Sequence, residues 1–237
     1  MLDSFLPKRR PQIIDRNNET LFTNGKLCPR FLVLMRSWDD AGTGRFFGEP
    51  LAGDMLRAAA YKRARFNPVM KKEGERLQVL LLNRDKKRVI LNFSVLLRAL
   101  KTNSTTSFTF IAKNITSESA VAQVQLFAKT DILIAAHGAG ITNAMYMLPG
   151  SHIVEIFPPF WYFGCYRKLV DNLRLSYSKV ISHGERGPEC KTDPKSMKCL
   201  IDGTRDRNFY VDVTAVKHAL KESYSLVWKN KFGVSVQ

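Results

Sequence analysis

DILIAAHGAGITNAMYMLPGSHIVEIFPP, residues 131–159, is the stretch that decides the fold. It opens with the apolar run Ile132–Ala136, which is too short for a stable helix and lies between Asp131 and a glycine loop, so we predict a buried strand. The loop itself, His137-Gly138-Ala139-Gly140, contains two glycines, which permit backbone angles closed to other residues and allow a ligand to approach closely. The pattern therefore predicts a strand that ends in a loop open to a ligand.

A helix and a second strand follow this loop. We predict the helix over residues 141–148, ended by Pro149-Gly150, and the strand over residues 153–157. A loop that leaves the carboxyl end of a parallel strand and opens a helix points free N–H groups outward, where a phosphate can bind. A glycine loop alone is weak evidence for such a site, and the order of the whole unit is the stronger argument.

Strands and helices alternate along the chain from residue 77 onward. Further strands are predicted at residues 77–82, 107–112 and 176–181, and helices at residues 93–101, 118–129, 162–174 and 214–229. Asn92 is placed to cap the first of these helices. Alternation at this spacing implies right-handed crossovers and a parallel, doubly wound sheet, which is the Rossmann-like α/β class. A polar loop is expected at residues 183–208.

The first third of the chain holds too few elements to close a domain of its own. Its pattern supports strands at residues 12–15 and 31–36 and one basic helix at residues 54–66. We therefore divide the chain into residues 1–75, a remnant of an amino-terminal domain with a linker, and residues 76–237, a Rossmann-like domain.

The chain is strongly basic, and much of the charge lies in one segment. The 237 residues carry 37 Lys and Arg against 21 Asp and Glu, a net charge of +16, and residues 57–101 hold thirteen basic against three acidic side chains, a local charge of +10. Such a field attracts nucleotide diphosphates, polyanions or an anionic membrane surface, although a solvated helix face and a linker explain most of the lysines. No nucleic-acid partner is expected, because recognition motifs and interleaved aromatic residues are missing.

Targeting signals on one side, and cysteines and glycosylation sequons on the other, lead to different predictions of the cellular compartment. Residues 1–12 are polar and basic, and no apolar run approaches the ~20 residues that a membrane span requires, so neither a signal peptide nor a span is predicted. Four cysteines and four N-glycosylation sequons nevertheless fit a lumenal protein, and Cys190 and Cys199 could form a disulfide there. The sequons are at Asn18, Asn92, Asn103 and Asn114.

Three sequence blocks resemble those of the family 61 glycosyltransferases. The first is HGAG-x-TNA-x(4)-PGS-x(3)-EI-x-P over residues 137–158, the second is R-x(3)-R-x-I-x-N over residues 84–92, and the third is Y-x(2)-L over residues 166–169 with Leu175 and Tyr177 after it. The blocks follow the family's order. The family includes plant xylan arabinosyl- and xylosyltransferases, the EGF-domain-specific O-linked N-acetylglucosamine transferase and the protein O-mannose N-acetylglucosaminyltransferase.

The resemblance implies a fold and a reaction. It predicts that residues 76–237 are the carboxyl-terminal, nucleotide-sugar-binding half of a GT-B glycosyltransferase. The implied reaction is an inverting, metal-independent transfer from a UDP-sugar (xylose, arabinose or N-acetylglucosamine) to a glycan or glycoprotein acceptor, with the acceptor bound largely by the other half. A truncated, non-catalytic paralogue, which folds and could bind nucleotide without transferring a sugar, is the alternative.

The resemblance also implies a Golgi or endoplasmic-reticulum enzyme with an amino-terminal membrane anchor. We therefore expect this chain to be the carboxyl-terminal part of a longer protein. No metal cofactor is expected, because no Asp-x-Asp pair occurs, the four histidines lack ligand spacing, and Cys190 and Cys199 have no second cysteine pair for zinc.

Nine residues are predicted to bind the nucleotide sugar: Arg84, Arg88, His137, Gly138, Ala139, Gly140, Thr142, Asn143 and Glu155. His137, at the end of a buried strand, is expected to donate to a phosphate or to the leaving diphosphate; the alternative is a histidine bonded to the backbone that holds the loop in shape. The catalytic base is not identified, and His137 is a poor candidate for it if it serves the phosphate.

The remaining candidates each carry two interpretations. Arg84 and Arg88 can balance the charge of a departing diphosphate, with a slight preference for Arg84, or one of them can support the loop. Lys86 and Lys87, which lie between them, are expected to face solvent.

Thr142 is expected to cap the helix, and Asn143 either caps it or reaches the phosphate. Glu155, inside an apolar strand, needs a ribose hydroxyl pair or an arginine as its partner. Tyr166 and Tyr177 are expected to pack, and residues 160–162 stack on a base or cover the sheet.

Overall fold

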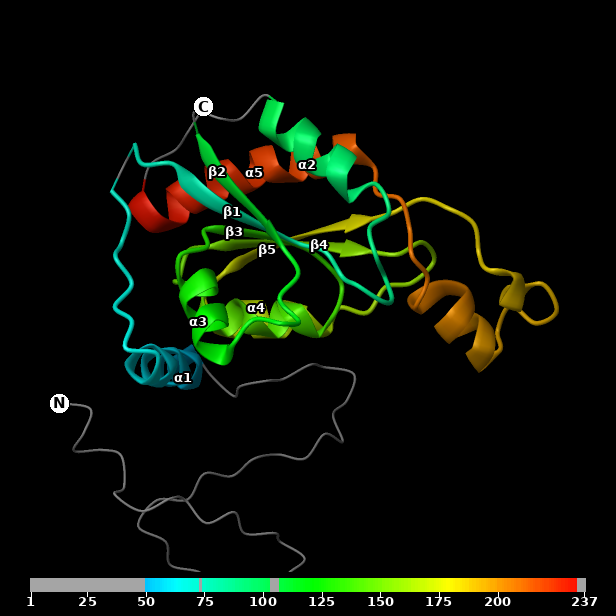
Figure 1. The fold of residues 1–237 in the computed structure, drawn as a ribbon, viewed down its shortest axis with the longest axis horizontal. Coiled ribbons are helices and arrows are strands. Elements are labelled where there is room, and N and C mark those ends of the chain that lie inside the picture. Colours follow the sequence, from blue (N-terminus) through cyan, green and yellow to red (C-terminus); the bar gives the residue numbers. More distant parts are fainter. Residues whose placement is uncertain (1–49, 73, 103–106, 234–237) are drawn as a thin grey trace, which may run out of the picture. The chain divides into compact units, whose positions relative to one another are not determined.

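A parallel sheet of five strands forms the centre of the molecule. The computed structural model describes residues 50–72, 74–102 and 107–233 of the chain. In this part the sheet has the strand order β2-β1-β3-β4-β5 (Figure 1). The strands are β1 (Leu77–Leu82), β2 (Phe108–Lys113), β3 (Ile132–Ala136), β4 (His152–Phe157) and β5 (Ser176–Ile181). The doubly wound, Rossmann-like α/β fold predicted from the sequence is confirmed.

The central strands are apolar along their whole length because helices cover both of their faces. Every residue of β3 and β4 is buried, and so is every residue of β1 except Gln78. A parallel strand with two covered faces has no solvent side, and its sequence therefore shows an unbroken apolar run. The edge strands β2 and β5 are mostly half-buried or exposed.

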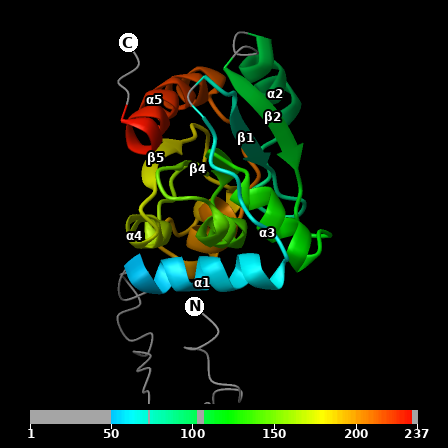
Figure 2. The ribbon, with the colours of Figure 1, turned by 90° about the vertical axis from the view of Figure 1, so that its left-hand side faces the viewer.

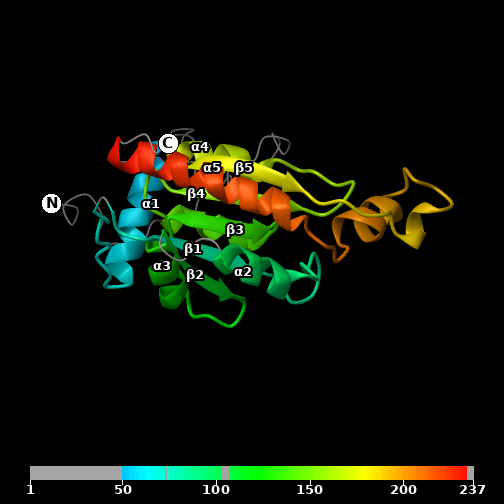
Figure 3. The same ribbon diagram turned by 90° about the horizontal axis from the view of Figure 1, so that it is seen from above.

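Helices form one layer on each face of the sheet (Figures 1 and 2). One layer contains α2 (Phe93–Thr102) and α5 (Val213–Phe232), and α5 runs along the sheet beside β3, β4 and β5 (Figure 3). The other contains α3 (Ala120–Ala128), α4 (Cys165–Asn172) and a 3₁₀ helix, η5 (Ala139–Tyr146). Alternate strand residues separate the two cores: Leu81 packs in the α2/α5 cluster, and Leu80 packs in the α3/α4 cluster.

Three local predictions are corrected by the structure. Residues expected to form an α-helix after the glycine loop form the 3₁₀ helix η5, because few residues lie between the loop and Pro149. Asn92 does not cap α2 with its side chain, since its amide donates to the Val211 carbonyl at 2.9 Å and its oxygen accepts from the Val211 N–H at 3.0 Å. Helix α4 begins at Cys165, three residues later than predicted.

Helix α1 (Pro50–Arg63) packs on the outside of the α3/α4 layer (Figure 2). Tyr61 and Ala64 form a small buried cluster with Val124 and Ala128 of α3. The Tyr61 hydroxyl also donates to the carbonyl of Tyr146 in η5 at 2.5 Å. The basic helix predicted ahead of residue 76 therefore lies against the Rossmann-like domain. The domain boundary stays a prediction, and the strands predicted at 12–15 and 31–36 lie outside the described residues.

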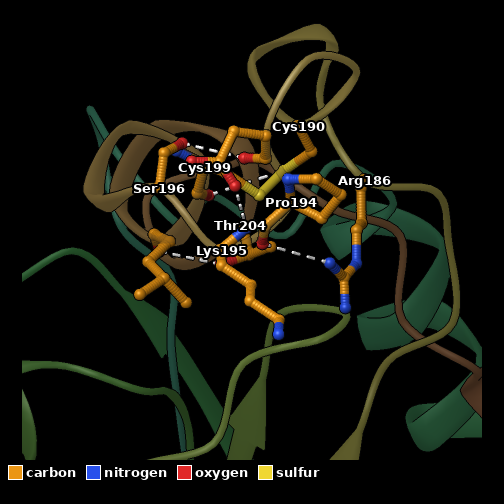
Figure 4. Close-up of a disulfide and its surroundings, with 9 residues drawn as sticks. Arg186, Cys190, Pro194, Lys195, Ser196, Cys199 and Thr204 are labelled. Carbon is orange, nitrogen blue, oxygen red and sulfur yellow. Dashed lines mark hydrogen bonds between the residues drawn. A yellow bond between two sulfur atoms is a disulfide. The ribbon is translucent and has the colours of Figure 1, made fainter.

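The segment between β5 and α5 is more structured than the polar loop predicted there. It contains a 3₁₀ turn, η6 (Pro188–Cys190), and a π-helix, η7 (Cys199–Arg205). The predicted disulfide between Cys190 and Cys199 joins the two turns (Figure 4). Farther along, Phe209 forms an isolated parallel bridge with Ile90, which ties this segment to the chain that follows β1.

Candidate functional site

Most of the predicted site residues gather where β1, β3 and β4 end, at the carboxyl edge of the sheet. The strand order changes direction between β1 and β3, and in open α/β sheets ligands bind at such a switch point. A hollow of about 210 Å³ lies there. It is lined by the segments that follow β1, β2 and β3, namely Leu82, Asn83, Arg84, Asp85, Asn114, Ile115, Thr116, Ala135, Ala136, Ala139, Gly140 and Ile141.

Arg84 lies directly against the glycine loop. Its Nε donates to the Lys87 carbonyl at 2.7 Å, and its Nη1 donates to the His137 carbonyl at 3.5 Å. A Cβ atom at Gly138 would come within 1.7 Å of Nη1, so a side chain there would require Arg84 to move. Arg84 thus supports the loop with one of its donors, which is the alternative role that the sequence left open for one of the two arginines.

Arg88 has an unusual backbone and an unpaired donor. Its φ of 60° lies in the left-handed region, which non-glycine residues seldom adopt. Its Nε is buried and has no hydrogen-bond partner within the described part of the chain. Burial lowers the pKa of Arg88, and the neighbouring charge of Arg84 lowers it further. Among the described residues Arg88 thus has a buried donor left unpaired, and which of the two arginines contacts a diphosphate stays a prediction.

Asp206 is a member of this cluster that the sequence did not indicate. Its carboxylate accepts from Arg205 at 2.9 Å and from Lys87 Nζ at 2.8 Å, and its carbonyl accepts from the Arg88 N–H at 3.4 Å. The hydrogen bond from Arg205 is the main cause that holds the pKa of Asp206 well below its usual range. Lys87, predicted to face solvent, is therefore ion-paired, although its side chain stays 59% exposed.

His137 and Glu155 form a buried pair. His137 Nδ1 contacts Glu155 Oε1, and the Tyr177 hydroxyl donates to Glu155 Oε2 at 2.6 Å. Glu155 is fully buried and His137 is 4% exposed. Within the described chain the partners of Glu155 are thus a histidine and a tyrosine instead of the expected arginine, and its contact with a ribose stays a prediction. Because a carboxylate only accepts, Nδ1 of His137 carries a proton, and Nε2 is the nitrogen left for a ligand.

The tyrosine of this group does more than pack. Burial, followed by the charge of Glu155, raises the pKa of Tyr177 far above its ordinary value. The phenol therefore remains a hydrogen-bond donor at any physiological pH. It holds the Glu155 carboxylate in place, and the carboxylate in turn orients the imidazole, which is one of the ways in which proteins fix the tautomer of a histidine.

Aromatic rings enclose the imidazole of His137. Its ring centroid lies 5.0 Å from that of Phe157, 4.6 Å from that of Trp161 and 5.4 Å from that of Tyr166. Trp161 and Tyr162 pack on Phe157, so these two residues cover the end of the sheet, one of the two roles predicted for residues 160–162. Burial around the site also raises the pKa of Tyr166 to about 12.

Thr142 and Asn143 hold η5 in place rather than capping it. The Thr142 side chain hydrogen-bonds to Tyr166, and Asn143 Nδ2 donates to Gln123 of α3 at 2.8 Å. The N-cap position of η5 is occupied by Gly138, which has no side chain, so no side chain caps this helix. The predicted cap at Thr142 was therefore wrong, and the amide of Asn143 is used for a contact that neither of its two interpretations included.

Sequence comparison decides the family. Residues 31–154, more than half of the chain, match the family model described as Glycosyltransferase 61. The chain belongs to glycosyltransferase family 61. The match includes the segments after β1 and β3 that carry Arg84, Arg88 and the glycine loop, and ends at Val154, so it stops short of Glu155 and Tyr177. Among curated proteins, none matches this family 61 chain.

A solved structure shows a weak likeness to this family 61 member. Apo D-mandelate dehydrogenase of Rhodotorula graminis aligns with a TM-score of 0.31 at 10% sequence identity, over 78% of this chain. The chain covers 61% of the length of that dehydrogenase. A likeness of this size carries no argument about the function.

Neither a metal cluster nor a membrane span is seen in the part of the chain that the structure describes. Within residues 50–72, 74–102 and 107–233, no three His, Cys, Asp or Glu side chains gather as metal ligands. Over the same ranges, no helix is both long and apolar enough to cross a bilayer. Metal independence and membrane anchoring both stay predictions.

Proposed function

We propose that this family 61 chain binds a UDP-sugar at the carboxyl edge of β1 and β3 and serves as the donor-binding half of a glycosyltransferase. The observation that supports this most directly is the buried, unpaired Nε of Arg88 beside a second arginine and a glycine loop. A diphosphate supplies two negative groups with several acceptor oxygens. It would satisfy Arg88, and it would find further N–H groups along the loop that opens η5.

The proposed reaction is a single displacement with inversion at the anomeric carbon. An acceptor hydroxyl attacks that carbon, the bond to the diphosphate oxygen breaks, and the negative charge on the departing UDP grows. Arg88 stabilises this charge directly, and Arg84 holds the loop that contributes backbone N–H groups, so the reaction as proposed requires no metal ion.

His137 is proposed to face the donor through Nε2. With Nδ1 held by Glu155, the ring has one fixed orientation, and it can donate to the leaving diphosphate if Nε2 is protonated. The acceptor, a glycan or a glycoprotein, is proposed to bind largely to a second, GT-B-type half, and the site of action is proposed to be the Golgi or endoplasmic-reticulum lumen. Xylose, arabinose and N-acetylglucosamine remain the candidate donor sugars.

Calorimetric titration with UDP in the presence of EDTA tests the proposal. We expect UDP to bind, Arg88→Ala to weaken the affinity at least tenfold, and Lys86→Ala to leave it within twofold, because Lys86 is exposed and lies in the same segment. Binding that needs a divalent ion would contradict metal independence. Equal affinity of the two variants would contradict the site.

A second titration separates the active enzyme from a non-catalytic paralogue. UDP-xylose and UDP-N-acetylglucosamine are compared with UDP, and hydrolysis of each donor is followed over hours. Slow release of free sugar supports a transferase site. Tight UDP binding without any discrimination or hydrolysis of the sugars supports the non-catalytic alternative.

A further inference from the structure

Two of the four sequons lie in the described part of the chain, and their environments differ sharply. At Asn92 both polar atoms of the side chain are used, since Nδ2 donates to the Val211 carbonyl at 2.9 Å and Oδ1 accepts from the Val211 N–H at 3.0 Å. A glycan on Nδ2 would break this pairing, which connects the segment after β1 to the strand-like segment before α5. The fold therefore excludes a glycan at Asn92.

Asn114 is exposed at the end of the edge strand β2. Its Oδ1 accepts from the Thr116 N–H at 3.0 Å and from the Thr116 hydroxyl at 2.7 Å. Within the described residues its Nδ2 makes no hydrogen bond, and both Asn114 and Thr116 are exposed. The amide nitrogen is thus free, while the oxygen and the hydroxyl of the same sequon contact each other.

We infer that Asn114 carries an N-linked glycan and that Asn92 does not. The position tolerates a large polar group, because β2 pairs only with β1 and its other edge is open to solvent within the described chain. The inference is independent of the proposed transferase activity. It requires only that the chain enters the secretory lumen. The Cys190–Cys199 disulfide fits that compartment, because disulfides persist in an oxidising environment.

The chemistry uses a diphosphate-linked oligosaccharide on a polyprenyl lipid as the donor. Nδ2 of Asn114 attacks the anomeric carbon, and a new carbon–nitrogen bond forms as the bond to the lipid diphosphate breaks. The amide loses one proton, and the lipid diphosphate leaves with the electron pair. The hydrogen bonds from Thr116 engage Oδ1 and leave Nδ2, the atom that reacts, without a hydrogen bond within the described chain.

Asn114 and Thr116 also line the switch-point hollow at which donor binding is proposed. A glycan on Asn114 would therefore stand directly beside the proposed donor site.

Peptide mass spectrometry of the secreted protein tests the inference directly. The chain is expressed behind a cleavable secretion signal in a eukaryotic host, and glycans are removed enzymatically in heavy-oxygen water, which marks each formerly glycosylated Asn. We expect the peptide with Asn114 to carry the mark and the peptide with Asn92 to lack it. An unmarked Asn114, or a marked Asn92 in the folded protein, would overturn the inference.

Matched variants give a second readout on gels. Asn114→Gln and Thr116→Ala each remove this sequon and should each lose the mobility shift of one glycan. Thr116→Ser keeps the sequon, and Ser94→Ala removes the exposed third residue of the Asn92 sequon, so both should migrate like the parent protein. Loss of a glycan in Ser94→Ala, or none in Asn114→Gln, would also overturn the inference, whatever the state of the other sequons.

Discussion

The guanidinium of Arg84 lies against the backbone of Gly138: a Cβ atom at Gly138 would lie 1.7 Å from Arg84 Nη1. Because of this contact, Arg84 reaches the carbonyl of His137, and the loop, the arginine and the histidine form one unit. The glycine therefore leaves room for Arg84 in this position, and its φ of 157° is a backbone angle that side chains rarely adopt.

Gly138→Ala should displace Arg84 and disturb the loop. We expect UDP affinity to fall at least tenfold as Arg84 moves aside, with a loss of stability of about 1–3 kcal/mol because the backbone angle at this position suits glycine. Gly140→Ala is the matched control for stability, because a Cβ there would meet Ile115 and Leu82 only at 3.5 and 3.7 Å, which are ordinary contacts. Urea unfolding compares the two variants, and titration with UDP compares Gly138→Ala with the parent protein. An unchanged UDP affinity in Gly138→Ala would show that the approach of Arg84 is unimportant.

Tyr177→Phe should destabilise the domain. It removes the donor at 2.6 Å from Glu155 Oε2 and leaves part of a buried carboxylate without a partner, at a cost of roughly 1–3 kcal/mol. Tyr210→Phe removes a hydroxyl from an exposed side chain and should be neutral within about 0.5 kcal/mol. Urea unfolding at pH 7 compares the two variants. A neutral Tyr177→Phe would mean that Glu155 is adequately held by His137 alone.

Stability should fall in mild acid because of His152. This fully buried imidazole lies between the hydroxyls of Ser176 at 2.7 Å and Ser178 at 2.9 Å, and burial lowers its pKa from 6.5 to about 4. A depressed histidine pKa means that the unfolded chain binds the proton first, so stability is lost as the pH falls through 6.5 toward 4. Linkage gives a loss of about 2 kcal/mol between pH 7 and pH 5.

Urea unfolding between pH 7 and pH 5 measures this slope. His152→Asn should be less stable at pH 7 and should show a flatter dependence on pH. His218→Asn, at an exposed position of α5, should keep the slope of the parent protein. A parent protein whose stability does not change over this range would show that His152 titrates normally.

Removal of the disulfide should weaken the site as well as the fold. The Cys190–Cys199 bond closes a short loop, for which chain entropy gives a stabilisation of roughly 2–3 kcal/mol. Cys199 also begins the π-helix that leads to Asp206 and its contacts with Lys87 and the Arg88 N–H. We expect the Cys190→Ser/Cys199→Ser double variant to lose several-fold in UDP affinity. Reductant should reproduce this loss in the parent protein and should not affect the double variant.

The sequence predicted what depends on local pattern. Strands β1, β3 and β5 have the bounds that the sequence predicted. The strands β1 and β3 are covered on both faces and therefore appear as apolar runs, and the edge strand β5 is recognised from the residues that flank it. The meeting of Arg84, Arg88 and His137 at one edge also followed, because parallel strands end on the same side.

What could not be predicted depends on contacts between distant segments. Asp206 lies more than a hundred residues after Lys87, in a stretch without periodicity, and its pairing follows from the path of the disulfide-bearing segment. Likewise, the partner of Glu155 depends on the register between β3 and β4, which places His137 within reach of the carboxylate. Composition alone carries no signal for either contact.

Helix α1 acts as a brace for the loop that follows β3. The hydroxyl of Tyr61 holds the carbonyl of Tyr146, the last residue of η5, whose first residue, Ala139, belongs to the glycine loop. The position of α1 therefore bears on the position of the helix that the glycine loop opens. A chain cut at residue 76 would lose both this hydrogen bond and the packing of Tyr61 and Ala64 on α3.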